Sequence, residues 1–168
     1  MLIGMTRQFS YAVALVCALQ FAACRQADGP LPATTPDTSN ELGDISRDMQ
    51  AVAGGDASGQ KDLTDDIGHY AQETSGAAAA AELSRRIAEA LKGKNIKAGQ
   101  AMPVAHTSWV AVAGRQLSEK QIDSLKNDMK TQLMSLGADE QHAQAAADQV
   151  GVVQQAVTAR HRRWYELL

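Results

Sequence analysis

The stretch Ser118-Glu-Lys-Gln-Ile-Asp-Ser-Leu-Lys-Asn-Asp-Met-Lys-Thr-Gln-Leu-Met-Ser-Leu136 decides the fold class of this 168-residue chain. Five of its apolar residues are Ile122, Leu125, Met129, Leu133 and Leu136. Because they recur every three or four positions, they lie on one face of an α-helix. Ser118 suits the N-cap of that helix, and Gly137 suits its end. The stretch therefore predicts an amphipathic helix that buries one face against other helices.

The same periodicity recurs on both sides of this helix. It predicts further helices over residues 39–53, 60–74, 77–93 and 139–166. Asp139 suits the N-cap of the last of them. Aromatic residues make up only 4% of the chain, so the core must consist of Ala, Leu, Ile, Val and Met. We expect an all-α fold, a small four- to five-helix bundle over residues 41–168.

The segment 94–114 is ambiguous, because a short apolar run does not distinguish a strand from a buried helix. Val104 to Ala113 contains the run Trp109-Val-Ala-Val, and Pro103 is expected to break any helix that includes it. A single strand would have no partner to pair with. An apolar connection or a short helix that covers the bundle is therefore the favoured interpretation.

The first 23 residues have the features of an export signal. Arg7 precedes an apolar run from Phe9 to Ala18, and small residues follow. The run is too short for a membrane span, which needs about 20 apolar residues. Residues 1–23 are therefore predicted to be a signal peptide that is removed from the mature protein.

The tetrapeptide Phe21-Ala22-Ala23-Cys24 resembles the lipobox of bacterial lipoproteins. The resemblance implies cleavage before Cys24, diacylation of its thiol and acylation of the new amino terminus, with acyl chains such as palmitate. By the same resemblance, Arg25 in place of Asp favours an anchor in the outer membrane, facing the periplasm. An anchor in the inner membrane and secretion remain alternatives.

Residues 24–40 show no apolar period and carry Pro30, Pro32 and Pro36. They are predicted to be a lipidated, flexible tether. Cys17 leaves with the signal peptide and Cys24 is acylated, so the mature chain has no thiol for a disulfide. The formal charge of −3 gives no general attraction to nucleic acid, which is not an expected partner.

The chain lacks the common catalytic motifs, such as His-Glu-x-x-His and Gly-x-Ser-x-Gly, so neither an enzyme nor a cofactor is expected. Two carboxylate–histidine pairs offer a metal-binding alternative: Asp66 with His69, and Asp139 with His142. The i, i+3 spacing places each pair on one helix face, as in the Glu-x-x-His motifs of ferritin-like proteins. Surface charge and an N-cap explain the same residues more simply.

Partner-binding candidates are Trp109, Arg160, Arg162, Arg163, Trp164 and Tyr165. Trp109 suits a core position or a partner anchor, and the basic residues near the C-terminus suit the end of a helix or an acidic partner. The favoured function is an envelope lipoprotein that binds another protein as an assembly factor or adaptor, or as an immunity protein. A metal-binding protein or enzyme and a structural envelope lipoprotein are the alternatives.

Overall fold

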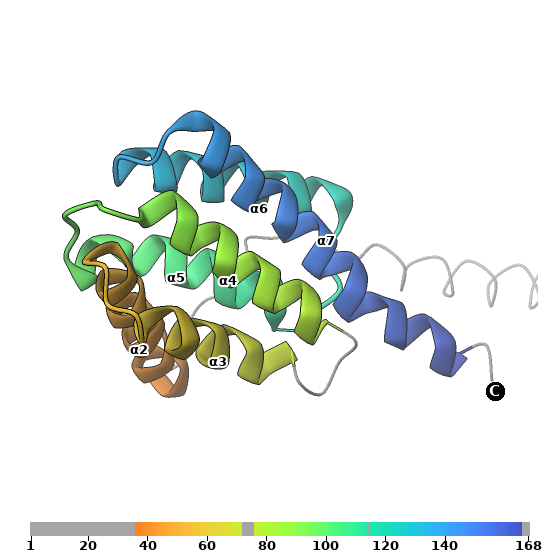
Figure 1. Ribbon diagram of the computed structural model, residues 1–168. Coiled ribbons are helices and arrows are strands. Elements are labelled where there is room, and N and C mark those ends of the chain that lie inside the picture. The colour runs from red at the N-terminus through yellow and green to blue at the C-terminus, as the bar shows by residue number, and fades with distance from the viewer. Residues whose placement is uncertain (1–35, 72–75, 114, 166–168) are drawn as a thin grey trace, which may run out of the picture. The chain divides into compact units, whose positions relative to one another are not determined.

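The computed structural model describes residues 36–71, 76–113 and 115–165, which form six α-helices and contain no β-strand. The helices are α2 (Pro36–Ala53), α3 (Gly59–Ala71), α4 (Ala77–Leu91), α5 (Ala98–Val112), α6 (Glu119–Ser135) and α7 (Glu140–Tyr165). Figure 1 shows them as one bundle. The predicted all-α bundle is confirmed, with six helices in the described part where four or five were expected.

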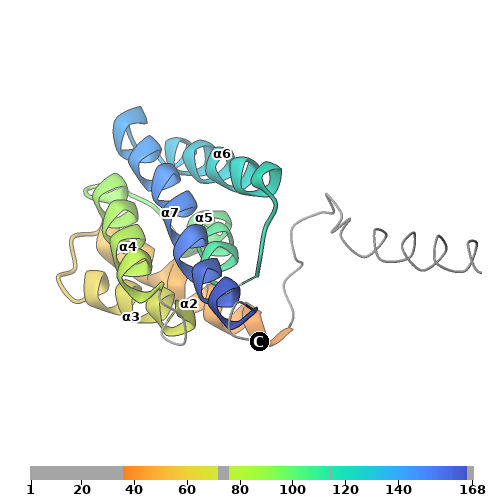
Figure 2. The same ribbon diagram turned by 90° about the vertical axis from the view of Figure 1, so that its right-hand side faces the viewer.

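The additional helix is α5, and it lies in the middle of the bundle. It packs against α2, α3, α6 and α7, and Figure 2 shows it between α2, α6 and α7. From Val104 to Val112 every side chain except that of His106 is buried. A helix that is enclosed in this way has no polar face and so lacks an amphipathic period. The ambiguity of segment 94–114 in the sequence follows from this central position.

The expectation that Pro103 breaks any helix is wrong, because Pro103 lies within α5. It is exposed in the second turn, close to the helix start. Backbone N–H groups in the first turn have no partner within the helix, so a proline near the start removes few hydrogen bonds. Here the lost bond is the one to the carbonyl of Gly99, which is itself exposed and accessible to water.

The first described helix begins within the predicted tether of residues 24–40, because α2 starts at Pro36. Proline suits the first turn of a helix, where its fixed φ is already helical and its missing N–H removes no intrahelical bond. Residues 36–40 therefore belong to helix α2. Residues 24–35 of the predicted tether and the predicted signal peptide lie outside the described residues.

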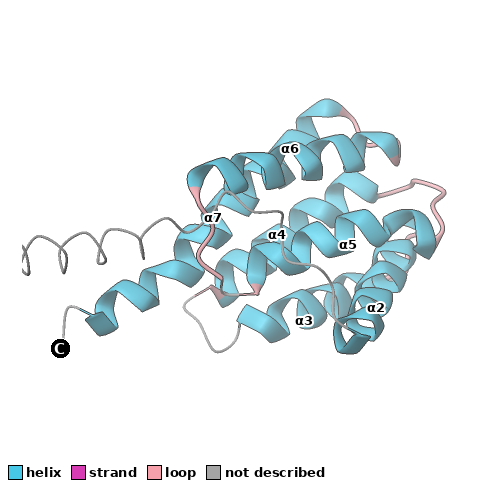
Figure 3. Ribbon diagram, turned by 180° about the vertical axis from the view of Figure 1, so that it is seen from behind, coloured by secondary structure: helices cyan, strands magenta, loops and turns pink. Residues whose placement is uncertain are grey.

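The other helices surround α5 in a continuous series. α3 packs between α2 and α4, α4 packs against α7, and α7 packs against α6, as the view from behind in Figure 3 also shows. Their predicted apolar stripes form the core. Its largest fully buried apolar side chains are Ile45, Met49, Leu63, Ile67, Leu83, Ile87, Leu91, Leu125, Met129 and Leu133.

Polar side chains from three neighbouring helices hold α5 in its register. Gln50 of α2 accepts a hydrogen bond from the N–H of Ala98 at the start of α5, at 3.2 Å. Thr107 donates to Gln132 of α6 at 2.9 Å. Near the end of α5, Gln154 of α7 donates to the carbonyl of Ala111 at 2.6 Å, within the buried core. The bonds of Gln50 and Gln154 satisfy backbone groups at the two ends of α5 that the helix itself leaves unpaired.

Glycines end the helices where the sequence predicts helix ends. Gly137 has φ of 91° after α6, and the N–H of Ala138 reaches the carbonyl of Leu133 at 3.0 Å. Gly55 has φ of 85° after α2, with the N–H of Asp56 on the carbonyl of Ala51 at 3.0 Å. Both are Schellman caps, which need a left-handed residue that glycine adopts without strain.

Candidate functional site

Several predicted site residues lie where the structure gives no side-chain detail. Cys24 is outside the described residues. The basic and aromatic residues of the C-terminal segment, Arg160, Arg162, Arg163, Trp164 and Tyr165, fall on the last turns of α7, and their side chains are outside the described part. Figure 1 shows these last turns extending beyond the start of α4. Their role in partner binding stays a prediction.

Trp109 lies in the core. Its side chain is 8% exposed on the central helix α5, and its ring stacks on that of His106 at a centroid distance of 6.4 Å. A partner anchor needs exposed aromatic surface in the free protein. The burial of Trp109 therefore favours the core interpretation over the partner-anchor interpretation.

Asp66 and His69 line a small hollow of about 90 Å³ between α2 and α3. Glu41, Asp44 and Ile45 of α2 complete its walls. Beside it, Asp48 of α2 faces Asp66 across the helix pair. This part of the surface gathers negative charge from both α2 and α3.

Asp139 and His142 form the N-cap structure of α7. One carboxylate oxygen of Asp139 accepts the backbone N–H of His142 at 3.0 Å, and the other lies 2.6 Å from its Nδ1. These hydrogen bonds hold the pKa of Asp139 below its ordinary value. The N-cap prediction for Asp139 is confirmed.

The two carboxylate–histidine pairs do not meet. One lines the hollow between α2 and α3, and the other lies at the start of α7 beside α4. Among the described residues, no group of three or more His, Cys, Asp or Glu side chains is arranged to hold a metal ion. The four residues of the metal-binding alternative therefore do not form one site.

A larger hollow of about 490 Å³ lies between the end of α4 and the start of α7, and we call it the α4–α7 hollow. Its lining residues are Arg86, Glu89, Ala90, Lys92, Lys94, Asp139, Gln141, His142 and Ala145. Among the described residues, three cationic and two acidic side chains face it, besides His142. The hollow is therefore polar and slightly cationic, unlike the acidic one between α2 and α3.

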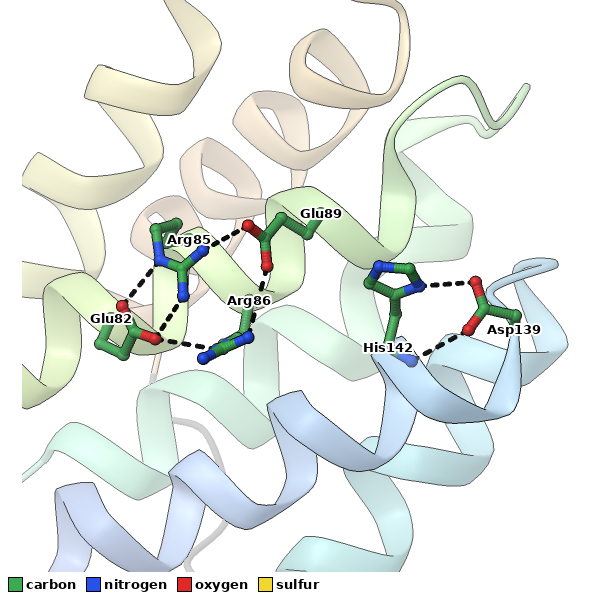
Figure 4. Close-up of polar contacts among 6 residues, drawn as sticks. All are labelled: Glu82, Arg85, Arg86, Glu89, Asp139 and His142. Carbon is green, nitrogen blue, oxygen red and sulfur yellow. Dashed lines mark hydrogen bonds and ion pairs between the residues drawn. The ribbon is translucent and has the colours of Figure 1, made fainter.

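The α4 wall carries an ion-pair network (Figure 4). Arg85 binds both carboxylate oxygens of Glu82, at 2.7 Å from Nε and 2.5 Å from Nη2, and it also contacts Glu89. Arg86 lies 2.8 Å from Glu82 and 3.6 Å from Glu89. The hydrogen bonds from Arg85 lower the pKa of Glu82 to about 2. Such exposed pairs contribute little stability, but they hold both guanidinium groups in place.

Lys92 and Lys94 differ from the rest of the wall, because within the described residues neither makes an ion pair or a side-chain hydrogen bond. Lys92 is exposed and Lys94 is half-buried, with its stem along Gly137. By contrast, Lys130 is bound to Glu140 at 2.8 Å. The two ammonium groups are the uncompensated charges of the α4–α7 hollow, and they can accept carboxylates from outside the bundle.

Sequence reasoning missed these two lysines and the carboxyl pair of Asp48 and Asp66. The charges on α4 recur at i, i+3 and i+4, so their mutual pairing has a local signal. Lys92 and Lys94 looked like ordinary residues at a helix end. Their part in a hollow depends on α7 packing beside α4, which no local pattern indicates.

No known protein family matches the chain, and neither a curated protein nor a solved structure is significantly similar to it. None of the described helices is both long enough and apolar enough to cross a membrane.

Proposed function

We propose that this chain is a lipid-anchored protein of the bacterial cell envelope whose helical domain binds another protein. The anchor is Cys24 of the lipobox-like sequence, in the outer membrane and facing the periplasm. The role is that of an assembly factor, an adaptor or an immunity protein, not that of an enzyme. The observation that supports binding is the open α4–α7 hollow with its two uncompensated lysines.

The hollow fits an acidic segment of a protein partner. The arginines of its α4 wall are already bound to Glu82 and Glu89. They therefore help to shape the hollow but contribute little unpaired positive charge. Lys92 and Lys94 supply the charge that a partner's carboxylates would neutralise. Complementary charge of this kind fixes the register of a complex and raises its association rate.

The anchor is tested by replacing Cys24 with serine. Serine has no thiol to acylate, so we expect the precursor to stay unprocessed or the protein to leave the membrane fraction. Metabolic labelling with a palmitate analogue, followed by membrane fractionation, measures both effects. Cys17→Ser, inside the predicted signal peptide, is the matched control and should still be labelled. Lipid labelling of the Cys24→Ser protein would contradict the proposed anchor.

The binding site is tested by reversing the two free charges with Lys92→Glu and Lys94→Glu together. We expect about a tenfold or greater loss of affinity for the envelope protein that the wild type captures, because attraction becomes repulsion. The measurement is quantitative capture from envelope extracts of the native organism, followed by titration of the captured protein.

The matched control reverses Lys61 and Lys120, which lie on α3 and α6 and give the same change in net charge. The control protein should bind as the wild type does. Equal capture by the Lys92→Glu/Lys94→Glu protein and the wild type would contradict the assignment of the α4–α7 hollow. Loss of binding in both double variants would indicate a general charge effect.

A further inference from the structure

Asp48 of α2 carries a buried carboxylate oxygen that lacks a donor. Among the described residues, no hydrogen-bond donor reaches its Oδ2 atom, which has almost no solvent contact. The group against it is another carboxyl, that of Asp66 on α3, and Asp62 of α3 lies nearby. A buried acceptor without a donor destabilises a protein, because it has lost its hydrogen bonds to water, so this arrangement needs an explanation.

A proton between the two carboxyls supplies the missing donor. Two ionised carboxylates in contact repel each other, so one of them holds its proton to a higher pH than usual. The protonated carboxyl then donates a hydrogen bond to the ionised one, and no acceptor is left unpaired. This pairing needs no additional group at the site.

We infer that Asp48 and Asp66 share one proton, and that losing this proton as the pH rises weakens the packing of α2 against α3. Because the pair joins two helices, its charge acts directly on their separation. The inference concerns the stability of the bundle and holds whether or not the α4–α7 hollow binds a partner.

The other charges around this pair reinforce the effect. Asp62 of α3 adds negative charge, and Arg47 of α2 offsets part of it. Glu41, Asp44 and His69 line the adjoining hollow together with Asp66.

Among the described residues, the other helices that pack against α2 offer no unpaired cation to the Asp48–Asp66 pair. α5 contains no Asp, Glu, Lys or Arg, and its one histidine, His106, stacks on Trp109. The two arginines of α4 are bound within its own network. The pair is therefore left with a proton as its main source of positive charge.

The direction of the pH dependence follows from the native pKa. Burial, and then the charge of Asp66, raise the pKa of Asp48 from 3.8 to about 7. Between those values the native state binds a proton that the unfolded chain has released, so stability falls as the pH rises. The stabilising contribution is complete below about pH 4 and is lost as the pH passes through about 7.

The test compares the folding equilibrium of the wild type and Asp48→Asn at pH 5 and pH 8, by chemical denaturation of the mature chain. We expect the wild-type equilibrium constant to fall by about tenfold or more between these pH values, since each unit of pKa difference allows a tenfold change. The amide that replaces the carboxyl cannot ionise, so the Asp48→Asn protein should lose most of this dependence and be more stable than the wild type at pH 8.

The matched control is Asp128→Asn on α6, which makes the same charge change outside α2 and α3. Its folding equilibrium should depend on pH as that of the wild type does. A second measurement needs no variant: the ¹³Cγ shift of Asp48 in the labelled wild type should titrate near neutral pH. Titration of Asp48 below pH 5, or an equal pH slope in the wild type and Asp48→Asn, would overturn the inference.

Discussion

Replacing Trp109 with alanine is expected to lower the free energy of unfolding by about 3–5 kcal/mol. The side chain is 8% exposed and belongs to α5, the helix that packs against four others. Removing it leaves a cavity where α5 meets its neighbours, and a core of Ala, Val and Leu has little freedom to close it. The free energy of unfolding of a single domain is about 5–15 kcal/mol, so this one substitution removes a large part of the total stability.

Chemical denaturation of the protein measures this effect, with Trp109→Phe as the control. Phenylalanine retains most of the buried surface. The Trp109→Phe protein should therefore lose less than half as much free energy of unfolding as the Trp109→Ala protein. The experiment also separates the two interpretations of Trp109. A partner anchor would leave the stability of the Trp109→Ala protein unchanged and abolish capture of the partner, which would contradict the core position.

The second large effect is expected for Gly59→Ala at the start of α3. A Cβ atom at this position would lie 2.9 Å from the Cβ of Ala51 and 2.9 Å from the backbone nitrogen of Val52. These atoms belong to the end of α2, which its Schellman cap holds in place, so the clash cannot be relieved by a side-chain rotation. We expect a loss of about 2–3 kcal/mol, as for overpacked cores, and a lower melting temperature by calorimetry.

Two other helical glycines provide matched controls for Gly59. A Cβ atom at Gly43 of α2 or at Gly68 of α3 would have no atom within 4 Å. Alanine is a better helix former than glycine, so each of these substitutions should stabilise the bundle by about 0.5–1 kcal/mol. If Gly59→Ala stabilised the bundle as these controls should, the result would contradict the close approach of α2 and α3.

The fold was predictable wherever a helix has one buried face. Met129 and Leu133 on α6, or Ile45 and Met49 on α2, repeat with the helical period and are buried as expected. α5 was not predictable in this way, because burial on all sides removes the period. The proline in the second turn of α5 led to a wrong prediction, because the effect of a proline on a helix depends on its distance from the helix start.

Whether a candidate site could be predicted also depends on how close its residues are in the chain. The cap of α7 was predictable because Asp139 and His142 are three residues apart on one segment, and their hydrogen bonds are local. The α4–α7 hollow needs Lys94 and Gln141, which are far apart in the chain, to face each other. The Asp48–Asp66 pair likewise depends on which faces of α2 and α3 meet.

The sequence by itself determined the all-α class, most helix ends and the apolar faces, because periodicity, caps and glycines act over a few neighbouring residues. It also contains the lipobox-like segment, from which the proposed anchor follows. Only the tertiary structure decided that α5 is central, that Trp109 is buried and that the two Asp–His pairs are separate. It also decided which charges remain uncompensated. These features depend on contacts between distant segments, which packing of the whole bundle selects.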